Sequence, residues 1–193
     1  MQTSRGSTLK GVITISLMAV NVVFWVPILL VVALAKLLIP LAAWRRWTSA
    51  LMIWIAQAWI SCNGAIFSLM GALRLEVDGV EGLDPRSWYL VLSNHQSWVD
   101  ILVLQKAFNR RIPFLKFFLK QELIWVPFLG LAWWALDFPF MRRYTAEHLA
   151  KHPEDRGKDL AVTRRACEEF RLIPTSVMNF VEGTRFTERK HAA

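Results

Sequence analysis

Two short polar segments contain the residue types that could do chemistry. In the first, Ser93–Asp100, a histidine precedes a carboxylate by five residues. An imidazole with one free nitrogen can take a proton, while a carboxylate on its other nitrogen fixes the tautomer and stabilises the imidazolium. Five residues turn a helix by ~500°, so His95 and Asp100 cannot share one helix face. We therefore expect His95 on a turn, Ser97 as a helix N-cap and Asp100 in the first helical turn.

The second polar segment is Phe180–Arg185. Gly183 allows close approach of a ligand to the backbone, and Arg185 offers a planar pair of donors to a phosphate. Glu182 could accept hydrogen bonds and hold the loop. Taken alone, each segment also fits a purely structural role. The first could be a capping histidine with an aspartate on helix N–H groups, and the second a glycine turn with a surface ion pair.

The elements around these segments alternate between strand and helix patterns. Strands are predicted at Arg74–Gly79, Trp88–Leu92 (apolar enough for burial on both faces), Ile112–Phe118, Asp137–Met141 and Ser176–Val181. Helices are predicted at Ser97–Phe108, Gln121–Ala135 (interrupted around Pro127 and Gly130) and Lys158–Leu172, with a loop at His148–Gly157. This order predicts an α/β fold, a mostly parallel sheet with flanking helices. Functional sites in such sheets lie at the carboxyl ends of strands, where both polar segments begin.

The first third of the chain is apolar and basic. Residues 12–35 and 47–73 contain no charge, and each could span a ~30 Å hydrocarbon core as a helix. The first acidic residue is Glu76, so six of the eight net positive charges precede it: Arg5, Lys10, Lys36, Arg45, Arg46 and Arg74. Bases that punctuate apolar segments favour a membrane surface with anionic lipid over a nucleic acid. We expect residues 1–73 to form a membrane-associated helical hairpin and 74–193 an α/β domain.

Two arrangements of this hairpin remain open, while a third, a soluble hairpin buried within the protein, is disfavoured by the length of the apolar runs. If both helices span the bilayer, Asn21 and Lys36 are costly at mid-depth unless they pair or reach the interface. A hairpin that enters only one leaflet, with Arg45 and Arg46 at the headgroups, avoids this cost.

Composition limits the remaining classes. With 54% hydrophobic and 20% charged residues, the chain is neither disordered nor of low complexity. Cys62 and Cys167 are too few for a disulfide scaffold or a four-cysteine zinc site. His148 and His152 are four residues apart, but Pro153 and the polar surroundings disfavour a metal site. We expect neither a metal nor a cofactor.

Together, the two polar segments resemble motifs of the glycerolipid acyltransferase family, whose best-known members are bacterial 1-acyl-glycerol-3-phosphate acyltransferases. The His-x4-Asp motif matches His95 and Asp100, and the Phe-Pro-Glu-Gly-Thr-Arg motif matches Phe180–Arg185 with Val181 in place of proline. An intermediate motif matches Phe140 and Arg143, with Arg142 as a competing assignment. The resemblance implies that His95 is the general base, that Asp100 orients it, and that substrate is bound by Arg143, Glu182, Gly183, Thr184 and Arg185. Lys116 and Lys120 are weaker candidates.

The resemblance also implies a reaction. A lysophospholipid hydroxyl attacks acyl-CoA or acyl-carrier protein as co-substrate, most simply converting 1-acylglycerol-3-phosphate to phosphatidic acid at a membrane. Because thioester donors are cytosolic, we expect a cytoplasmic catalytic face, in a bacterial inner membrane. The family's fold continues beyond the second motif, so the chain, which ends at Ala193, looks truncated.

Two alternatives remain: another lysophospholipid as acceptor, or a non-catalytic lipid-binding or adaptor protein with the same fold. The adaptor predicts damage to a motif residue, but His95, Asp100, Glu182, Gly183 and Arg185 are all present. A lipid hydrolase would need a nucleophile or metal, and Ser97 lacks the Gly-x-Ser-x-Gly elbow.

Overall fold

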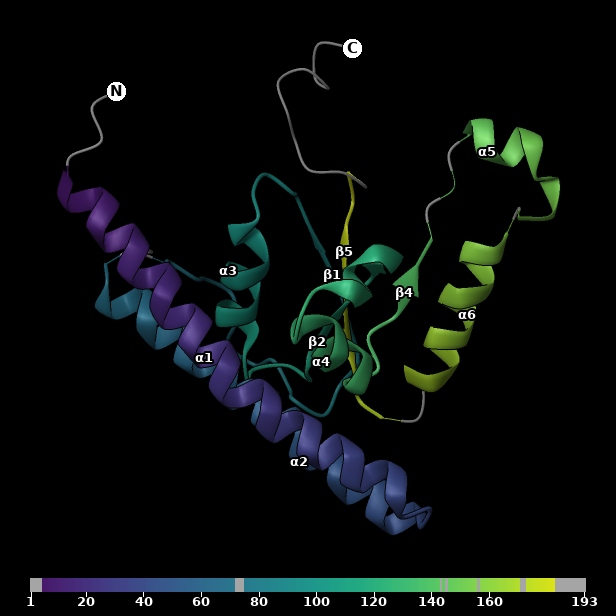
Figure 1. Cartoon of the computed structure of the whole chain (residues 1–193), viewed down its shortest axis with the longest axis horizontal. Coiled ribbons are helices and arrows are strands. Elements are labelled where there is room, and N and C mark those ends of the chain that lie inside the picture. Colours follow the sequence, from purple (N-terminus) through teal and green to yellow (C-terminus); the bar gives the residue numbers. More distant parts are fainter. Residues whose placement is uncertain are drawn as a thin grey trace.

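The structure, a computed structural model, describes residues 5–71, 75–142, 144, 146–155, 157–170 and 173–182. The first two helices form a long hairpin, and the rest of the chain forms a small α/β domain beside it (Figure 1). The elements are α1 Arg5–Leu38, α2 Ala42–Leu69, β1 Tyr89–Ser93, α3 Val99–Phe108, β2 Leu115–Phe117, β3 Leu119–Lys120, the 3-10 helix η1 Gln121–Trp125, α4 Leu129–Ala135, β4 Phe140–Met141, α5 Ala146–Lys151, the 3-10 helix η2 Pro153–Asp155, α6 Lys158–Phe170 and β5 Ser176–Phe180.

The hairpin pairs the polar groups that its apolar helices contain. Asn21 of α1 is buried and donates its amide to Asn63 Oδ1 of α2 at 2.9 Å and to the Trp59 carbonyl at 3.3 Å. At the turn between the helices, Trp44 Nε1 donates to the Ala35 carbonyl at 2.9 Å. The Asn21 amide therefore has hydrogen-bond partners within the hairpin, which meets the condition for placing it among apolar residues.

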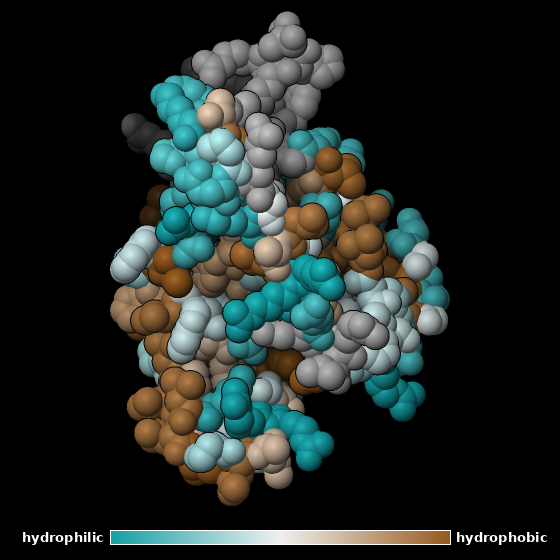
Figure 2. Space-filling view, turned by 90° about the vertical axis from the view of Figure 1, so that its right-hand side faces the viewer, coloured by the Kyte–Doolittle hydropathy of each residue, from teal (hydrophilic) through white to brown (hydrophobic). Residues whose placement is uncertain are grey.

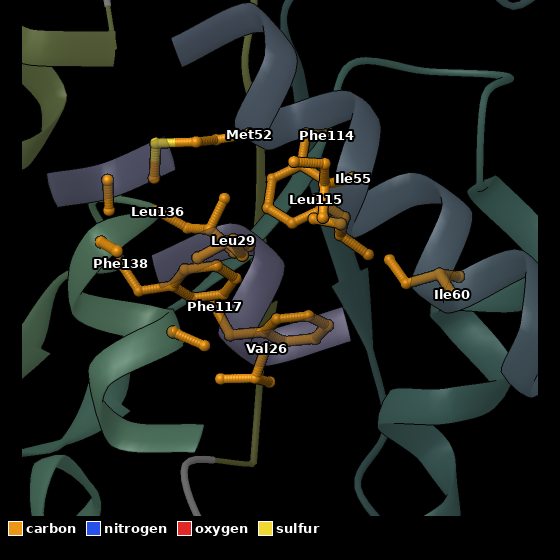
Figure 3. Packing of buried hydrophobic residues seen from close by; sticks show 14 of the residues in the cluster. Val26, Leu29, Met52, Ile55, Ile60, Phe114, Leu115, Phe117, Leu136 and Phe138 are labelled. Atoms are coloured by element: carbon orange, nitrogen blue, oxygen red, sulfur yellow. The ribbon is translucent and has the colours of Figure 1, made fainter. Parts of the chain in front are cut away.

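One side of the hairpin is built into the core of the α/β domain. Val26 and Leu29 of α1 and Met52 of α2 are almost fully buried and belong to the same cluster as Phe117 and Leu136 (Figure 3). Helix α1 packs on α4, and α2 packs on α3. The opposite side of the hairpin exposes large apolar side chains along its length: Val12, Val20, Val23, Phe24, Val31, Leu34, Leu38, Trp47 and Trp54.

The central sheet is parallel, as predicted. Its strand order is β1-β5-β2, so β5, the last strand in the chain, lies between the other two. A separate two-stranded parallel ladder joins β3 to β4. In Figure 1 the hairpin and α3 lie on one side of β5, and α6 lies on the other. The carboxyl ends of β1 and β5 meet at one edge, where both polar segments begin.

Two strand predictions were wrong. β1 is not buried on both faces, because Leu90 is 68% exposed and Leu92 is 58% exposed. These side chains point away from the hairpin, and no described element covers them. The strand predicted at Arg74–Gly79 is also absent among its described residues, 75–79, which have no regular structure. Residues 75–79 do not pair with the outer side of β1, although β1 is an edge strand of the sheet.

Two further segments differ in detail from the sequence prediction. Of the predicted strand 112–118 only Leu115–Phe117 forms a strand, β2, and the short strand β3 that follows it at Leu119–Lys120 belongs to a different sheet. The predicted loop His148–Gly157 contains α5 and η2. In α5, Lys151 Nζ lies 2.8 Å from Glu147 Oε1, a helical i,i+4 ion pair that supports the short helix.

Gly130 provides a test of the packing between η1 and α4. It is buried at the start of α4, and a Cβ there would overlap the backbone carbonyl of Ile124. Because backbone must move to admit the methyl group, we expect Gly130→Ala to lower the free energy of unfolding by about 1–3 kcal/mol. Thermal unfolding in detergent measures the loss.

Gly11→Ala is the matched control. Gly11 lies in exposed α1, where a Cβ meets no neighbouring atom, so alanine is expected to be neutral or to stabilise by about 0.5–1 kcal/mol. Equal melting temperatures for Gly130→Ala and the wild type would contradict the close packing.

Candidate active site

Pairing of β1 with β5 brings the two polar segments together. Ser93, the last residue of β1, is in register with Phe180, and the Val181 N–H donates to the Ser93 carbonyl at 3.3 Å. Two residues beyond each strand end, the His95 N–H donates to Glu182 Oε2 at 3.4 Å. Glu182 thus bonds the backbone of the candidate base across a gap of 87 residues in the sequence.

The Asp100 carboxylate organises the turn that holds His95. Its Oδ2 lies 3.0 Å from His95 Nδ1, and it accepts the backbone N–H groups of Gln96 at 2.6 Å and Ser97 at 2.8 Å. Its Oδ1 accepts the Ser97 hydroxyl at 3.2 Å. A single carboxylate therefore fixes both the turn and the imidazole.

Ser97 caps the helix that follows this turn, as predicted. Trp98, the residue before α3, already has helical backbone dihedrals, and its side chain makes no cap hydrogen bond. Ser97 Oγ accepts the Val99 N–H at 3.1 Å, and Asp100 in the first turn accepts the Ser97 N–H in return.

The surroundings of Asp100 keep it ionised. Partial burial alone would raise the pKa of this carboxyl, but hydrogen bonds from Ser97, His95 and Gln96 outweigh it and hold the pKa below its ordinary value. An ionised carboxylate can only accept hydrogen bonds, so His95 Nδ1 carries the proton and Nε2 is the nitrogen with a free lone pair. This is the tautomer that a general base needs.

Phe180 forms one wall of the site. Its ring stacks on the His95 ring, with centroids 3.9 Å apart and planes inclined by 17°. The His95 side chain is 16% exposed and that of Asp100 is 23% exposed. The stacking holds the plane of the imidazole, while the remaining exposure leaves a path to it. Sequence reasoning assigned no contact to Phe180. Its position at the end of a predicted strand, where the second polar segment begins, could have indicated one.

Of the remaining predicted site residues, some lie outside the described residues, and the others are exposed or bond other groups. Arg143, Gly183, Thr184 and Arg185 lie outside the described residues. The alternative to Arg143, Arg142, is exposed just after β4, and Lys120 is exposed at the end of β3. Lys116 is directed elsewhere, because its Nζ donates to the Asp137 carbonyl at 3.4 Å and lies 5.0 Å from the Phe170 ring centroid.

An apolar cavity of about 190 Å³ lies between the hairpin and the domain. Helix α3, which carries Asp100 in its first turn, contributes two apolar residues to its lining, and aromatic side chains from the hairpin and the domain complete it: Ile101, Leu102, Trp59, Phe114, Phe117 and Trp133. The cavity is large and apolar enough to accept part of an apolar chain.

Comparison with known proteins shows the family to which the chain belongs. The family model described as Acyltransferase matches residues 74–193. The chain belongs to the acyltransferase family. Among its relatives, 1-acyl-sn-glycerol-3-phosphate acyltransferase alpha of Mus musculus is 30% identical over 114 residues, which is 58% of this chain and 35% of the relative. The Homo sapiens protein of the same name gives the same values.

A solved structure has the same fold. The 1-acyl-sn-glycerophosphate (LPA) acyltransferase PlsC from Thermotoga maritima matches with a TM-score of 0.63 and 19% identity, over 94% of this chain and 62% of that one. The match confirms the predicted α/β fold with a mostly parallel sheet and flanking helices. This member of the acyltransferase family therefore spans about a third of the mammalian relatives and under two thirds of the solved structure.

Asp100 allows a test of the site by pH. Because its pKa is lower in the folded protein, the carboxylate stabilises the fold fully above its ordinary pKa of about 3.9, and this contribution is lost as pH falls through the folded value. We expect Asp100→Asn to cost about 1–3 kcal/mol at pH 7 and progressively less below about pH 4. Melting temperatures of both proteins from pH 7 to pH 3 measure this convergence.

Asp78→Asn serves as the control for loss of a carboxylate, since Asp78 is exposed and far along the chain from the site. If the difference in melting temperature between the wild type and Asp100→Asn stays constant with pH, the stabilising role of the ionised Asp100 carboxylate is contradicted.

Proposed function

We propose that this chain carries the catalytic centre of a lysophospholipid acyltransferase, most simply one that acylates 1-acylglycerol-3-phosphate to phosphatidic acid. The observation that carries the proposal is His95, whose Nδ1 lies 3.0 Å from Asp100 and whose Nε2 is left to take a proton. The names of the relatives support this acceptor. The donor is a fatty acyl thioester, acyl-CoA or acyl-carrier protein.

The reaction follows from this geometry. His95 Nε2 takes the proton of the acceptor hydroxyl as the oxygen attacks the thioester carbonyl, and Asp100 stabilises the imidazolium that forms. The new C–O bond forms, the C–S bond breaks, and the departing thiolate receives the proton from His95. The acceptor alcohol is itself the nucleophile. The Ser97 hydroxyl supports this choice, because it bonds Asp100 and the Val99 N–H rather than the His95 ring.

The acceptor phosphate is assigned to the loop after β5 and to the segment after β4. Glu182 accepts a hydrogen bond from the backbone of His95, so the described part of this loop lies beside the base. We assign acceptor binding to this loop and to the arginine after β4: Glu182, Gly183, Thr184, Arg185 and Arg143. Two guanidinium groups match a phosphomonoester that carries nearly two negative charges.

An acyl chain is assigned to the apolar cavity on α3. The cavity lining begins at Ile101 and Leu102, directly after Asp100. A chain in this cavity leaves its polar end toward the turn that holds His95. The apolar cavity therefore suits the acyl chain of a substrate.

The hairpin is proposed to lie in one leaflet. Both of its helices are long and apolar enough to cross a membrane, but their domain contacts run along much of their length. Asn109 Nδ2 donates to the Gln57 carbonyl and Ser61 Oγ, Lys106 Nζ donates to Ser68 Oγ, and Lys36 pairs with Asp137. Two spanning helices would bury these polar groups in hydrocarbon, which is expensive. We assign the catalytic face to the cytoplasm of a bacterial cell, where thioester donors occur.

The adaptor alternative is disfavoured by the same geometry. A binding protein needs neither a lowered Asp100 pKa nor a stacked, hydrogen-bonded histidine, and both are present.

The function is tested first at His95. Because His95 supplies the base in this proposal, we expect His95→Ala to lower acyl transfer by about 10²–10⁴-fold while the fold is retained. Transfer of radiolabelled acyl groups to a panel of lysophospholipids, with acyl-CoA and acyl-carrier protein in turn, measures activity on the full chain. His152→Ala, an exposed histidine, is the control. Wild-type turnover by His95→Ala would reject the assignment.

The acceptor site is tested at Arg185. Loss of a charge-assisted hydrogen bond to the phosphate predicts that Arg185→Ala raises the acceptor KM by roughly 10- to 150-fold and the donor KM much less. Lysine should rescue only in part, since it supplies charge without the planar fork. Kinetics with acceptor and donor varied separately decide the matter. Equal effects on both substrates would show that Arg185 only braces the loop.

The membrane arrangement is tested at the hairpin turn. Leu41, which precedes α2, is 65% exposed. In a chain with Cys62→Ser and Cys167→Ser, we expect Leu41→Cys to be protected from a membrane-impermeant maleimide added outside intact cells. Labelling from outside would establish a spanning hairpin and reject the one-leaflet arrangement. An added cysteine at Asp78 reports accessibility of the catalytic side.

A further inference from the structure

A second, basic pocket lies at the tip of the hairpin, remote from His95. Its volume is about 430 Å³, and it lies between the hairpin turn, β2 and the residues that lead into β5. Thr175 lies at the amino end of β5, whereas Glu182 and His95 lie beyond the carboxyl end. The pocket and the candidate active site are therefore at opposite edges of the sheet.

The pocket combines a cationic rim with an apolar floor. Four cationic side chains and one carboxylate line it, a net charge of +3: Lys36, Arg45, Arg46, Lys116 and Asp137. The floor is formed by buried apolar side chains: Met52, Phe114, Leu136 and Phe170. This pattern suits a ligand with an anionic group and adjoining apolar parts.

The cations are not all neutralised within the protein. Lys36 Nζ lies 3.5 Å from Asp137 Oδ2, and Lys116 bonds the Asp137 carbonyl. Among the described residues, by contrast, no carboxylate forms an ion pair with Arg45 or Arg46. Both arginines lie near the amino end of α2, where the positive end of the helix dipole disfavours cations, and the first turn contains no acidic residue that compensates. A bound anion would relieve this concentration of positive charge.

The surface beside the pocket is strongly apolar. Leu37, Leu38, Leu41 and Trp47 are each more than half exposed at the tip. Figure 2, which views the α6 side of the molecule, shows brown and teal surface side by side on the tip at the bottom of the view, below a recess. Phosphate-binding side chains and surface for acyl chains thus meet at one place.

We propose that this pocket binds the phosphate of an anionic membrane phospholipid, at a site separate from that of the substrates. The phosphate lies between Arg45, Arg46 and Lys36, and the acyl chains run along the exposed leucines of the tip. A guanidinium pair binds phosphate with charge-assisted hydrogen bonds. A free phosphate would leave the exposed apolar side chains of the tip unused, which is why we assign the ligand to a lipid. The bound lipid holds the tip of the hairpin at headgroup depth.

Lipid binding is measured by native mass spectrometry on the full chain in a non-ionic detergent, with dioleoyl-phosphatidylglycerol and dioleoyl-phosphatidylcholine as probes. We expect one phosphatidylglycerol to be retained with about tenfold or greater preference. Arg45→Gln with Arg46→Gln should weaken its binding by about tenfold or more. The matched control, Arg164→Gln with Arg165→Gln on α6, removes the same charge and should bind as the wild type does. His95→Ala should also bind as the wild type does.

Two more measurements distinguish binding inside the pocket from attraction of lipid to the charged surface alone. Ser49→Phe fills the pocket without changing any charge and should also abolish selective retention, with circular dichroism confirming the fold. Inorganic phosphate at the lipid's concentration should not displace it. Equal retention of the two lipids, wild-type binding by either pocket variant, or displacement by inorganic phosphate would each overturn the proposal.

Discussion

The hydrogen-bond ladder between β1 and β5 sets the position of each described side chain at the candidate catalytic edge. The pairing of Ser93 with Phe180 puts the Phe180 ring against the imidazole of His95 and brings Glu182 to its backbone. Because the strands are parallel, their carboxyl ends coincide, and two segments distant in the chain end at one place. A shift of one residue in this ladder would turn Phe180 to the other face and remove the wall of the site.

The hairpin has two apolar surfaces with different roles. Val26, Leu29 and Met52 complete the core on one side, together with Phe117 and Met178 of the sheet. The small sheet buries one face on this cluster, so the domain without the hairpin would expose a large apolar area to water. The other surface of the hairpin stays exposed, and it is the surface that the proposed membrane attachment would use. In that proposal, membrane attachment and folding of the domain use opposite sides of the same two helices.

Local patterns in the sequence were sufficient for much of this structure. The uncharged segments predicted the hairpin helices, and the His95–Asp100 spacing predicted a turn followed by a helix, as observed. The errors concern contacts that no local pattern encodes. The alternation at 75–79 could not reveal that no strand lies beside it, and the apolar run of β1 could not reveal that Leu90 and Leu92 face no described element. The reach of Lys116 toward Asp137 likewise depends on tertiary packing.

Helix α3 connects the hairpin to the candidate site. Its first turn holds Asp100, while Lys106 and Asn109 near its other end bond α2 at Ser68 and Ser61. Ten helical residues make a rod of about 15 Å, too short to bend appreciably. In the one-leaflet arrangement proposed above, a tilt of α2 would act on the end of this rod that carries Lys106 and Asn109, and through the rod on the turn that Asp100 organises. The path from the bilayer to the candidate base would then run through the hydrogen bond between Asp100 and His95.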